Sequence, residues 1–447
     1  MIALTDGQIL RFVDRLERDE VCMHGFELRQ GGDIRAQGDW RPFSKGEPHR
    51  MYSVSKSMVS LAVGLLAGEG LLRLDDPIVR YFPDLLPPHP DERLTRLCIS
   101  DMLRMATCHR ATTYKTAPCD CWAASFFTVA PTHEPGTLFQ YDTSATQVLG
   151  VLCERLSGQG LLEFLQNRVF DAAGATGPKK WLTDPSGAPQ GGSGLMMTLE
   201  DLGKVAQLIM DGGRGVLDKG YLSLATTRRI DTPLERNPEE RHGYGWQFWM
   251  TRSGWAMYGM GGQLAVAWPQ RDLLLCTTAD TRLDAFGVQR IYDAFFESFS
   301  QPEEAPAGRG QLRERLDALE VRGVRHDPGA RMAWTGTYRV ASNTSGLEAV
   351  AFGPNEVRLE WKHGVHVFAW GAPGCVQKGV FSGTQVPTLT SAGVSSGMLR
   401  VRCQLIGERP GGIEMLFAAQ GPHLTIRLRG MSDPYIDCYD GWFCAHA

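Results

Sequence analysis

The chain has 447 residues, of which 43% are hydrophobic and 21% are charged, and its formal net charge is -4. This composition is typical of a globular protein with more than one domain, without the basic stripe that follows nucleic-acid phosphates. The most apolar run, residues 58–67, is far shorter than the ~20 residues that a membrane helix needs. We therefore expect neither nucleic acid nor a membrane as partner, and the sequence leaves the oligomeric state open.

The N-terminal residues place apolar side chains at helical spacing over 9–16, between charged residues. An export signal needs an uninterrupted apolar core instead, so we expect a surface helix and a cytoplasmic protein. The eleven cysteines are odd in number and irregularly spaced, which favours reduced thiols. The Cys and His residues at 108–109 and 119–121 lack the spacing of a structural zinc site, so no metal is predicted.

The first predicted elements are two strands over 22–28 and 34–40, joined by the turn signal Gly31-Gly32. Residues 53–68 carry apolar side chains on more than one helical face, which predicts a helix buried in the core. Between residues 75 and 219, short helical patterns alternate with connectors rich in proline and glycine. This middle region is therefore expected to be a helical insertion.

Strand signals return over 243–250, 254–268 and 272–278, and a helical pattern follows over 286–299. The simplest arrangement is an antiparallel sheet built from both ends of residues 1–300 and flanked by helices. The expected fold class of this first domain is α/β (α+β).

Residues 301–330 have the composition of a linker that also holds a short helix. Residues 331–447 then show short alternating runs separated by turn residues, among them 356–361, 365–370, 399–405 and 423–428. Such a pattern predicts a separate, all-β antiparallel barrel as the C-terminal domain.

Ser53 and Lys56 stand at the start of the predicted buried helix. Residues three apart lie on the same side of a helix, so the lysine amine can approach the serine hydroxyl. A lysine can activate a serine when burial and the positive end of a helix lower its pKa. Chance supplies this spacing about once in such a chain, but Lys56 is the only charge between Arg50 and Glu69. Catalysis and a paired structural lysine are both compatible with that buried charge.

The stretch Met-Tyr-Ser-Val-Ser-Lys-Ser-Met at 51–58 resembles the first active-site box of the serine β-lactamase and penicillin-binding-protein superfamily. It is most similar to the branch of class C β-lactamases, esterases and D-aminopeptidases. Further similar segments follow in the family's order, at 71–78, 99–107, 135–141 and 192–198. The resemblance covers roughly residues 20–300 and implies a β-lactamase-like catalytic domain. The C-terminal barrel resembles the lipocalin-like modules of some D-aminopeptidase relatives.

The family's second box is Tyr-x-Asn, and here it reads Tyr141-Asp142-Thr143. The resemblance assigns Tyr141 the role of proton shuttle, and an adjacent ammonium would lower the pKa of its phenol. A core tyrosine with a satisfied hydroxyl is the alternative. The sequence leaves open whether Thr143 or Ser144 takes the place of the missing amide.

The family's third box is Lys-Thr-Gly or His-x-Gly, and here Met257-Tyr258-Gly259 stands before Met-Gly-Gly-Gln at 260–263. This version resembles esterase-like and oligoamide-hydrolase members. It implies that the backbone N–H groups of Ser53 and Met260 form the oxyanion hole, with Gly259 allowing close backbone approach. The cation that holds a substrate carboxylate is lost. Met257 and Tyr258 line an apolar acyl pocket or simply pack in a strand.

Two further groups of side chains have competing interpretations. Trp246, Phe248 and Trp249 either wall the site or belong to the core. His363 and His366 lie three apart in a predicted strand and should point to opposite faces, which does not suit a shared metal.

The sequence thus predicts a serine hydrolase that cleaves a small-molecule amide or ester through an acyl-enzyme on Ser53. Lys56 and Tyr141 complete the catalytic group, and no metal or organic cofactor is required. A β-lactamase or DD-peptidase is one alternative. A non-catalytic ligand-binding or sensor protein is another, because a fold does not prove turnover.

Overall fold

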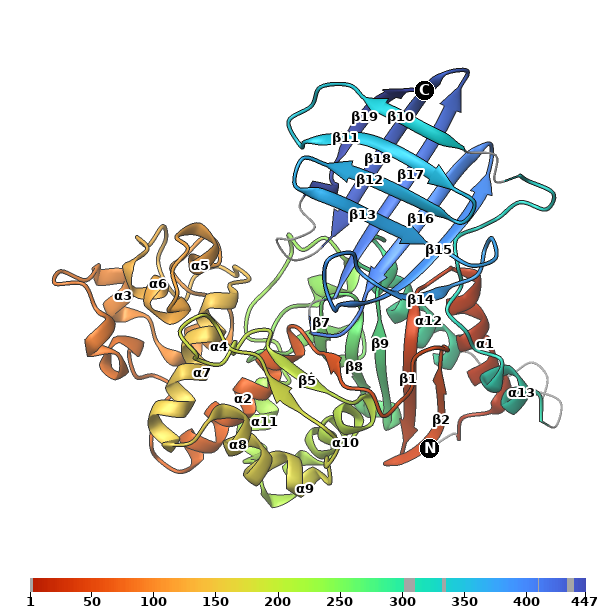
Figure 1. The fold of residues 1–447 in the computed structure, drawn as a ribbon. Helices are drawn as coiled ribbons and strands as arrows, with labels where there is room; N and C mark the ends of the chain where they lie inside the picture. The colour runs from red at the N-terminus through yellow and green to blue at the C-terminus, as the bar shows by residue number, and fades with distance from the viewer. Residues whose placement is uncertain (1–2, 301–309, 332–334, 409, 432–437) are drawn as a thin grey trace. The chain divides into compact units, whose positions relative to one another are not determined.

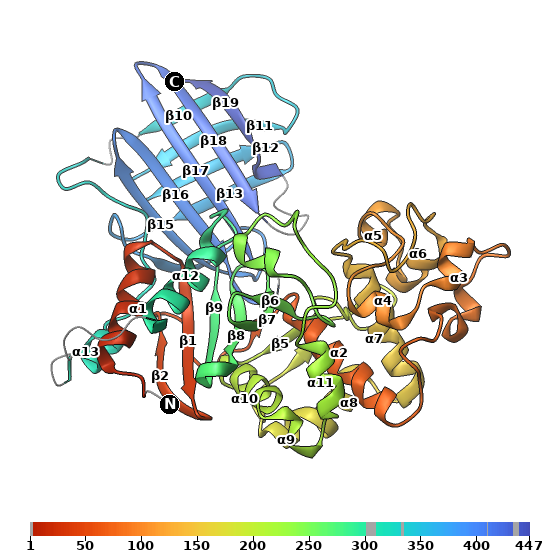
Figure 2. The ribbon, with the colours of Figure 1, turned by 180° about the vertical axis from the view of Figure 1, so that it is seen from behind.

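The computed structural model describes residues 3–300, 310–331, 335–408, 410–431 and 438–447. The chain forms two compact units, which Figures 1 and 2 show from opposite sides. The first unit comprises residues 1–281 and 286–319, and the second comprises residues 282–285 and 320–447. Each unit has a hydrophobic core of its own.

The first unit is built on a six-stranded antiparallel sheet with the order β2-β1-β9-β8-β7-β6 (Figure 1). Its strands are β1 (Met23–Gln30), β2 (Asp33–Asp39), β6 (Trp249–Thr251), β7 (Gly254–Gly259), β8 (Gln263–Trp268) and β9 (Leu273–Ala279). Strand β1 pairs with β9 in the middle of the sheet. The prediction of an antiparallel sheet built from both ends of this region is therefore confirmed.

Helices cover both faces of this sheet. Helices α1 (Asp6–Arg18) and α12 (Gly287–Ser300) pack together on one face, and α2 (Val54–Gly68) and α10 (Leu199–Met210) lie on the other (Figures 1 and 2). Helix α1 begins with a capping box between Thr5 and Gln8 and buries its apolar stripe. In α2 every residue except the last two is buried, so the predicted core helix is confirmed.

The middle of the first unit is a helical insertion, as expected. It contains α3 (Glu92–Arg96), α4 (Ile99–Leu103), α5 (Thr113–Thr116), α6 (Trp122–Thr128), α7 (Thr143–Ser157), α8 (Leu161–Leu165), a π-helical turn (Gln166–Phe170), α9 (Asp171–Ala173) and α11 (Lys219–Ala225). A small sheet with the order β3-β5-β4 ties this region to the chain before α2. Its strands are β3 (His49–Arg50), β4 (Lys180–Trp181) and β5 (Leu195–Met197).

The predicted strand over 243–250 is wrong over most of its length, because a strand begins only at Trp249, with β6, and Tyr244 forms isolated bridges only. Gly243 has a φ of 107° and Gln247 a φ of 67°. Both angles lie outside the β region, so the chain cannot continue as a strand through these positions.

The second unit is a ten-stranded antiparallel sheet that curls into a nearly closed barrel, with β13 and β14 as its two edge strands (Figure 1). The strands are β10 (Gly336–Val340), β11 (Leu347–Gly353), β12 (Glu356–Trp361), β13 (Gly364–Ala369), β14 (Gln377–Val380), β15 (Pro387–Ser395), β16 (Met398–Leu405), β17 (Gly411–Gln420), β18 (His423–Met431) and β19 (Gly441–His446). The predicted all-β barrel is confirmed.

The four residues 282–285 belong to the barrel although β9 and α12 flank them in the chain. The Arg429 guanidinium donates a hydrogen bond of 3.0 Å to the Leu283 carbonyl, and Arg282 donates to the carbonyl of Pro410. A Cβ placed on Gly412 would lie 3.2 Å from the Leu283 side chain. Leu283 therefore packs directly on β17.

Most of the predicted linker 301–330 is described, but residues 301–309 lie outside the described part of the chain. Helix α13 (Gln311–Asp317) and Leu319 belong to the first unit. A Cβ on Gly38 in β2 would lie 2.8 Å from Leu319 and 3.3 Å from Leu316. These two leucines therefore cover the outer strand of the first unit.

The expectation that His363 and His366 point apart is wrong. His363 lies in the two-residue turn between β12 and β13, where the alternation of a strand does not apply, and the two ring centroids are 5.8 Å apart. In the described ranges, no group of three or more His, Cys, Asp or Glu residues could hold a metal ion. In the part of the chain that the structure describes, no disulfide joins any of the eleven cysteines. Of the helices that the structure describes, none is long and apolar enough to cross a membrane.

Candidate active site

Ser53 stands directly before α2. The two residues before Tyr52 are hydrogen-bonded to the small sheet, which fixes the backbone that leads to Ser53. The Met51 N–H donates to the Leu195 carbonyl at 2.8 Å, and Arg50 pairs with Met196 across β3 and β5. Tyr52 has a φ of 47°, a left-handed conformation that is uncommon for a bulky residue and typical of functional turns. The chain therefore turns sharply into α2 and leaves the Ser53 side chain half-buried.

Lys56 is brought to Ser53 as the helical spacing predicts. Its side chain is only 1% exposed, and its Nζ lies 2.9 Å from the Ser53 hydroxyl oxygen and 2.7 Å from the Gly192 carbonyl oxygen. Burial lowers the pKa of Lys56 to about 7, while the Asp142 carboxylate acts to raise it and Lys115 to lower it. Near neutral pH a large share of Lys56 is therefore an uncharged amine, which can accept a proton.

Tyr141 adjoins the same pair. Burial raises the pKa of its phenol, and a hydrogen bond with Ser53 acts in the opposite direction. The Lys56 Nζ lies 4.9 Å from the Tyr141 ring centroid. The expectation of a lowered Tyr141 pKa is therefore wrong, because desolvation outweighs the influence of its neighbours. Tyr141 keeps its proton at neutral pH, and Lys56 is the better base.

Asp142 is fully buried at the N-cap of α7. Its carboxylate accepts hydrogen bonds from the Ser144 N–H at 2.9 Å, from the Ser144 hydroxyl and from the Thr107 hydroxyl at 3.3 Å. Burial raises the pKa of Asp142 to about 6. It supplies a negative charge that acts on Lys56, although the sequence offered no separate reason to single it out.

The neighbourhood of α7 bears on which side chain replaces the amide of the second box. The Ser144 hydroxyl bonds to Asp142 and accepts from the Thr113 N–H at 3.1 Å, so it is occupied by structural contacts. Thr143 is half-buried, and its methyl group would lie 2.5 Å from a Cβ on Gly192. Thr143 therefore lies beside Gly192, whose carbonyl accepts the hydrogen bond from Lys56.

The end of β7 lies directly against the chain before Ser53. A Cβ on Gly259 would lie 2.1 Å from the Met51 carbonyl oxygen, so only glycine allows this approach. Met260 follows at the turn, with 46% of its surface exposed. The two predicted oxyanion donors, the N–H groups of Ser53 and Met260, therefore belong to elements in direct contact.

Met257 and Tyr258 differ in their surroundings. Met257 is fully buried in the main core with Met51 and Val54, as the strand-packing alternative describes. Tyr258 is half-buried, and its ring centroid lies 6.4 Å from that of Trp249.

Trp249 and Trp246 also differ in their surroundings. Trp249 stacks on Tyr141 with centroids 5.6 Å apart and an interplanar angle of 18°, within an aromatic cluster of Phe139, Tyr141, Tyr244, Trp249 and Tyr258. Trp246 instead lies in the main core, 5.2 Å from the ring of Tyr221. Trp246 therefore packs as the core alternative describes, and Trp249 lies beside Tyr141.

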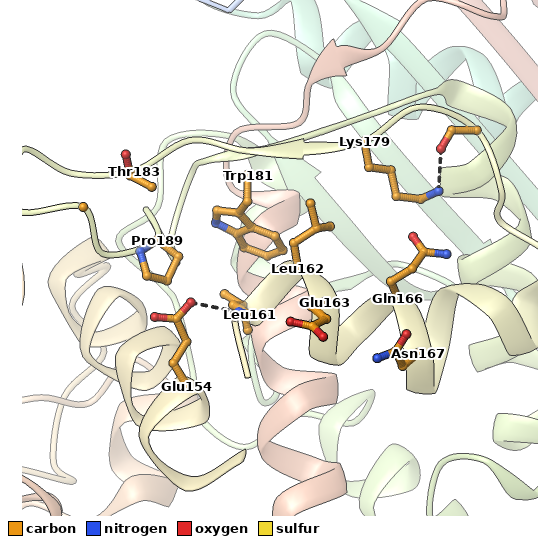
Figure 3. A pocket seen from close by; sticks show the side chains of 13 residues that line it. Glu154, Leu161, Leu162, Glu163, Gln166, Asn167, Lys179, Trp181, Thr183 and Pro189 are labelled. Atoms are coloured by element: carbon orange, nitrogen blue, oxygen red, sulfur yellow. Dashed lines mark hydrogen bonds between the residues drawn. The ribbon is translucent and has the colours of Figure 1, made fainter. Parts of the chain in front are cut away.

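A pocket of about 530 Å³ opens elsewhere in the first unit, between α7, α8 and β4 (Figure 3). Its apolar part includes Leu161, Leu162, Trp181 and Pro189, and Glu154 and Glu163 add carboxylates. The predicted catalytic residues do not line it. We therefore treat it as separate from the site at Ser53.

Comparison with known proteins places the chain in a family. Residues 23–281, more than half of the chain, match the model of the family described as Beta-lactamase. The chain belongs to the Beta-lactamase family. One relative is the 6-aminohexanoate-dimer hydrolase of Paenarthrobacter ureafaciens, 26% identical over 227 residues. That match covers 46% of this chain and 57% of the relative, so the chain spans little more than half of that protein's length.

Solved structures confirm the Beta-lactamase fold. The octameric penicillin-binding protein homologue from Pyrococcus abyssi matches with a TM-score of 0.51 at 14% identity, over 98% of this chain and 99% of its own. The D-amino acid amidase from Ochrobactrum anthropi matches with a TM-score of 0.52 at 17% identity, over 66% of this chain and 97% of its own. The first of these likenesses extends through the barrel as well as the catalytic fold.

Proposed function

We propose that this member of the Beta-lactamase family is a serine hydrolase that cleaves amide or ester bonds through an acyl-enzyme on Ser53. The observation that carries the proposal is the contact of 2.9 Å between the buried Lys56 amine and the Ser53 hydroxyl. A lysine with a pKa of about 7 has the proton affinity of a general base at neutral pH.

Acylation begins when neutral Lys56 takes the proton of the Ser53 hydroxyl. The Ser53 oxygen then bonds to the carbonyl carbon of the substrate, and the carbonyl oxygen becomes an oxyanion. The N–H groups of Ser53 and Met260 stabilise that charge. Throughout this step the Gly192 carbonyl accepts a hydrogen bond from Lys56, which keeps the amine aimed at the serine.

The tetrahedral intermediate collapses when its bond to the leaving group breaks. Protonated Lys56 returns its proton through the Tyr141 hydroxyl to the departing amine or alkoxide, which leaves as a neutral molecule. Tyr141 suits this relay because its raised pKa keeps the phenol protonated between transfers. Water then attacks the acyl-enzyme and gives a proton to Lys56. As the bond between the acyl carbon and the Ser53 oxygen breaks, Lys56 returns that proton to the Ser53 oxygen, and the acid is released.

The third box favours substrates without a carboxylate beside the scissile bond. Met257-Tyr258-Gly259 offers no cation where the family carries lysine or histidine. The aromatic cluster around Tyr141 instead offers apolar surface. The likeness to a 6-aminohexanoate-dimer hydrolase and to a D-amino acid amidase supports an amide. We therefore propose neutral amides or esters, and not β-lactams, as the substrate class.

The test compares the wild type with Ser53→Ala on three substrates, a short-chain nitrophenyl ester, a D-alanine anilide and a fluorescent penicillin. We expect release from the ester or the anilide, and a mass increase of one acyl group on intact wild type but not on Ser53→Ala. Fast penicillin turnover with little release from the others would assign a β-lactamase. Absence of both turnover and adduct would leave a binding or sensor protein.

A further inference from the structure

The turn between β7 and β8 carries the Met260 N–H. Each carbonyl group of this turn accepts a hydrogen bond. The Gly262 N–H donates to the Gly259 carbonyl at 3.2 Å, and Gly261 has a φ of 86°, which is the geometry of a type II turn. The carbonyl of Gly261 accepts from the Thr281 N–H at 3.0 Å, and that of Gly262 from the Thr277 hydroxyl at 2.8 Å. The Met260 carbonyl accepts from the side chain of Gln263 at 3.2 Å.

Gln263 reaches this position from the first residue of β8. It pairs with Gly259 across the two strands, so its side chain lies on the sheet face that meets the chain before Ser53. Its Nε2 also donates to the Ala279 carbonyl in β9 at 2.7 Å. Because both partners are carbonyl oxygens, the amide nitrogen must occupy this end of the side chain.

The other end of the amide has a different environment. The Gln263 side chain is only 5% exposed, and its Oε1 finds no hydrogen-bond partner among the residues that the structure describes. An unpaired buried acceptor costs about 1–3 kcal/mol. A residue chosen for core stability alone would avoid that cost. We therefore infer that residue 263 is a glutamine because its Nε2 donates to the Met260 and Ala279 carbonyls.

The Met260 carbonyl belongs to the central peptide of the turn, which distinguishes a type II turn from type I. The Met260 N–H belongs to the preceding peptide, whose carbonyl, that of Gly259, accepts from the Gly262 N–H. Holding the Met260 carbonyl therefore acts on this N–H through the turn as a whole, by keeping the turn in its type II form. We propose that Gln263 is a positioning residue for the oxyanion hole, which it serves by fixing the turn that presents the Met260 N–H. This inference rests on the proposed serine-hydrolase function.

The test replaces Gln263 with methionine, which keeps the volume and removes both donors and the unpaired acceptor. We expect the variant to fold with a melting temperature that is only modestly lowered, because the Met260 and Ala279 carbonyls lose their donor while the unpaired Oε1 is also removed. We expect kcat/KM for a nitrophenyl ester to fall roughly tenfold to hundredfold, with the loss in kcat, as when an oxyanion donor is misplaced. A structural role alone would lower stability without a selective loss in kcat.

A second substrate isolates the oxyanion. Replacing the ester carbonyl oxygen with sulfur gives a thionoester, whose sulfur anion gains less from N–H donors. Gln263→Met should therefore lower the rate ratio of oxygen ester to thionoester severalfold. The matched control is Gln207→Met in α10, where the amide is 3% exposed and donates to Asp211 at 2.9 Å. The control should keep the wild-type ratio.

The outcomes separate this inference from the proposed function. An active wild type with an unchanged rate ratio in Gln263→Met would overturn the positioning role and leave the serine hydrolase standing. A wild type that neither turns over the ester nor is labelled at Ser53 by a fluorophosphonate would remove both. If Gln263→Met does not fold, Gln263→Glu serves instead, because its ionised carboxylate cannot donate and its activity relative to wild type should recover as the pH falls.

Discussion

Lys56 illustrates how burial converts an ordinary lysine into a base. The same side chain on a surface would stay charged far above neutral pH, but its 1% exposure brings the pKa to about 7. The isolated charge in an apolar helix was visible in the sequence. The Gly192 carbonyl that holds its amine was not, because a backbone carbonyl leaves no signature in residue type.

The first prediction concerns the pH dependence that follows from this base. Protonation removes the base form of Lys56, so kcat/KM for a neutral ester should fall as the pH decreases through about 7. Well below that pKa the decline should approach about tenfold per pH unit. Steady-state rates between pH 5 and 9 check this, and a rate that is flat from pH 5 to 7 would rule out Lys56 as the base.

The second prediction tests the two charges that act on Lys56. Asp142→Asn removes the carboxylate that raises the Lys56 pKa, so the acid limb of the profile should move to lower pH. Asparagine keeps an oxygen that can accept from the Ser144 N–H, as Asp142 does. Lys115→Met removes a positive charge that lowers the same pKa, so the limb should move to higher pH. Shifts in the same direction would contradict this account.

Elements with a local sequence signal could be predicted, whereas a turn that is fixed by contacts between distant residues could not. The buried spacing of α2 and the Gly31-Gly32 hairpin follow from local patterns that tertiary contacts then reinforce. Residues 243–248 carry strand-forming aromatics, yet the left-handed Gln247 interrupts them. Its side chain is tied to the Met102 and Leu103 carbonyls, more than 140 positions away in the sequence. Such long-range contacts are invisible to local patterns.

In the candidate site, too, some residues could be predicted from the sequence and others only from the fold. Family order supplied Ser53, Lys56 and Tyr141, which the structure brings together. Trp246 and Trp249 are the same residue type three positions apart, and only the fold decides which of them stacks on Tyr141.

The third prediction concerns the close approach of β7 to α2. Gly259→Ala would place a Cβ 2.1 Å from the Met51 carbonyl oxygen, so the strand must move away from Ser53. We expect about 1–3 kcal/mol of destabilisation from the steric conflict. Activity should fall by roughly a hundredfold or more, because a displacement of about 1 Å has that effect.

Gly68→Ala provides the matched control for that prediction. Gly68 ends α2, and a Cβ there would meet nothing within 4 Å. Alanine favours a helix by up to about 1 kcal/mol over glycine, so the control should be neutral or slightly stabilising in chemical denaturation. An active, stable Gly259→Ala would show that the approach is not needed.

At the scale of the whole molecule, the predicted linker 301–330 does not form a part of its own. Its residues up to 319 belong to the first unit, and those from 320 onward belong to the second. Leu319 is 1% exposed and, with Leu316, covers Gly38 in β2. The first unit therefore includes α13.

The fourth prediction follows from this assignment. A chain cut after residue 319 should melt at a higher temperature than one cut after residue 310, because only the longer chain keeps these leucines. The buried Leu319 contributes about 1.5–3 kcal/mol and the half-buried Leu316 adds to it, so the difference should reach roughly 5 °C or more. Calorimetry of the two truncations checks this, and equal melting temperatures would show that α13 adds no stability.

Because residues 282–285 belong to the barrel unit, the barrel cannot be exchanged in evolution as one continuous segment. A barrel joined only at the end of the first unit could be exchanged by a single recombination event. Here one junction near residue 319 would bring a foreign barrel against the original Leu283, which packs on β17. Chimaeras should therefore need two crossovers, and we expect Leu283 and its barrel partners to be inherited as one unit.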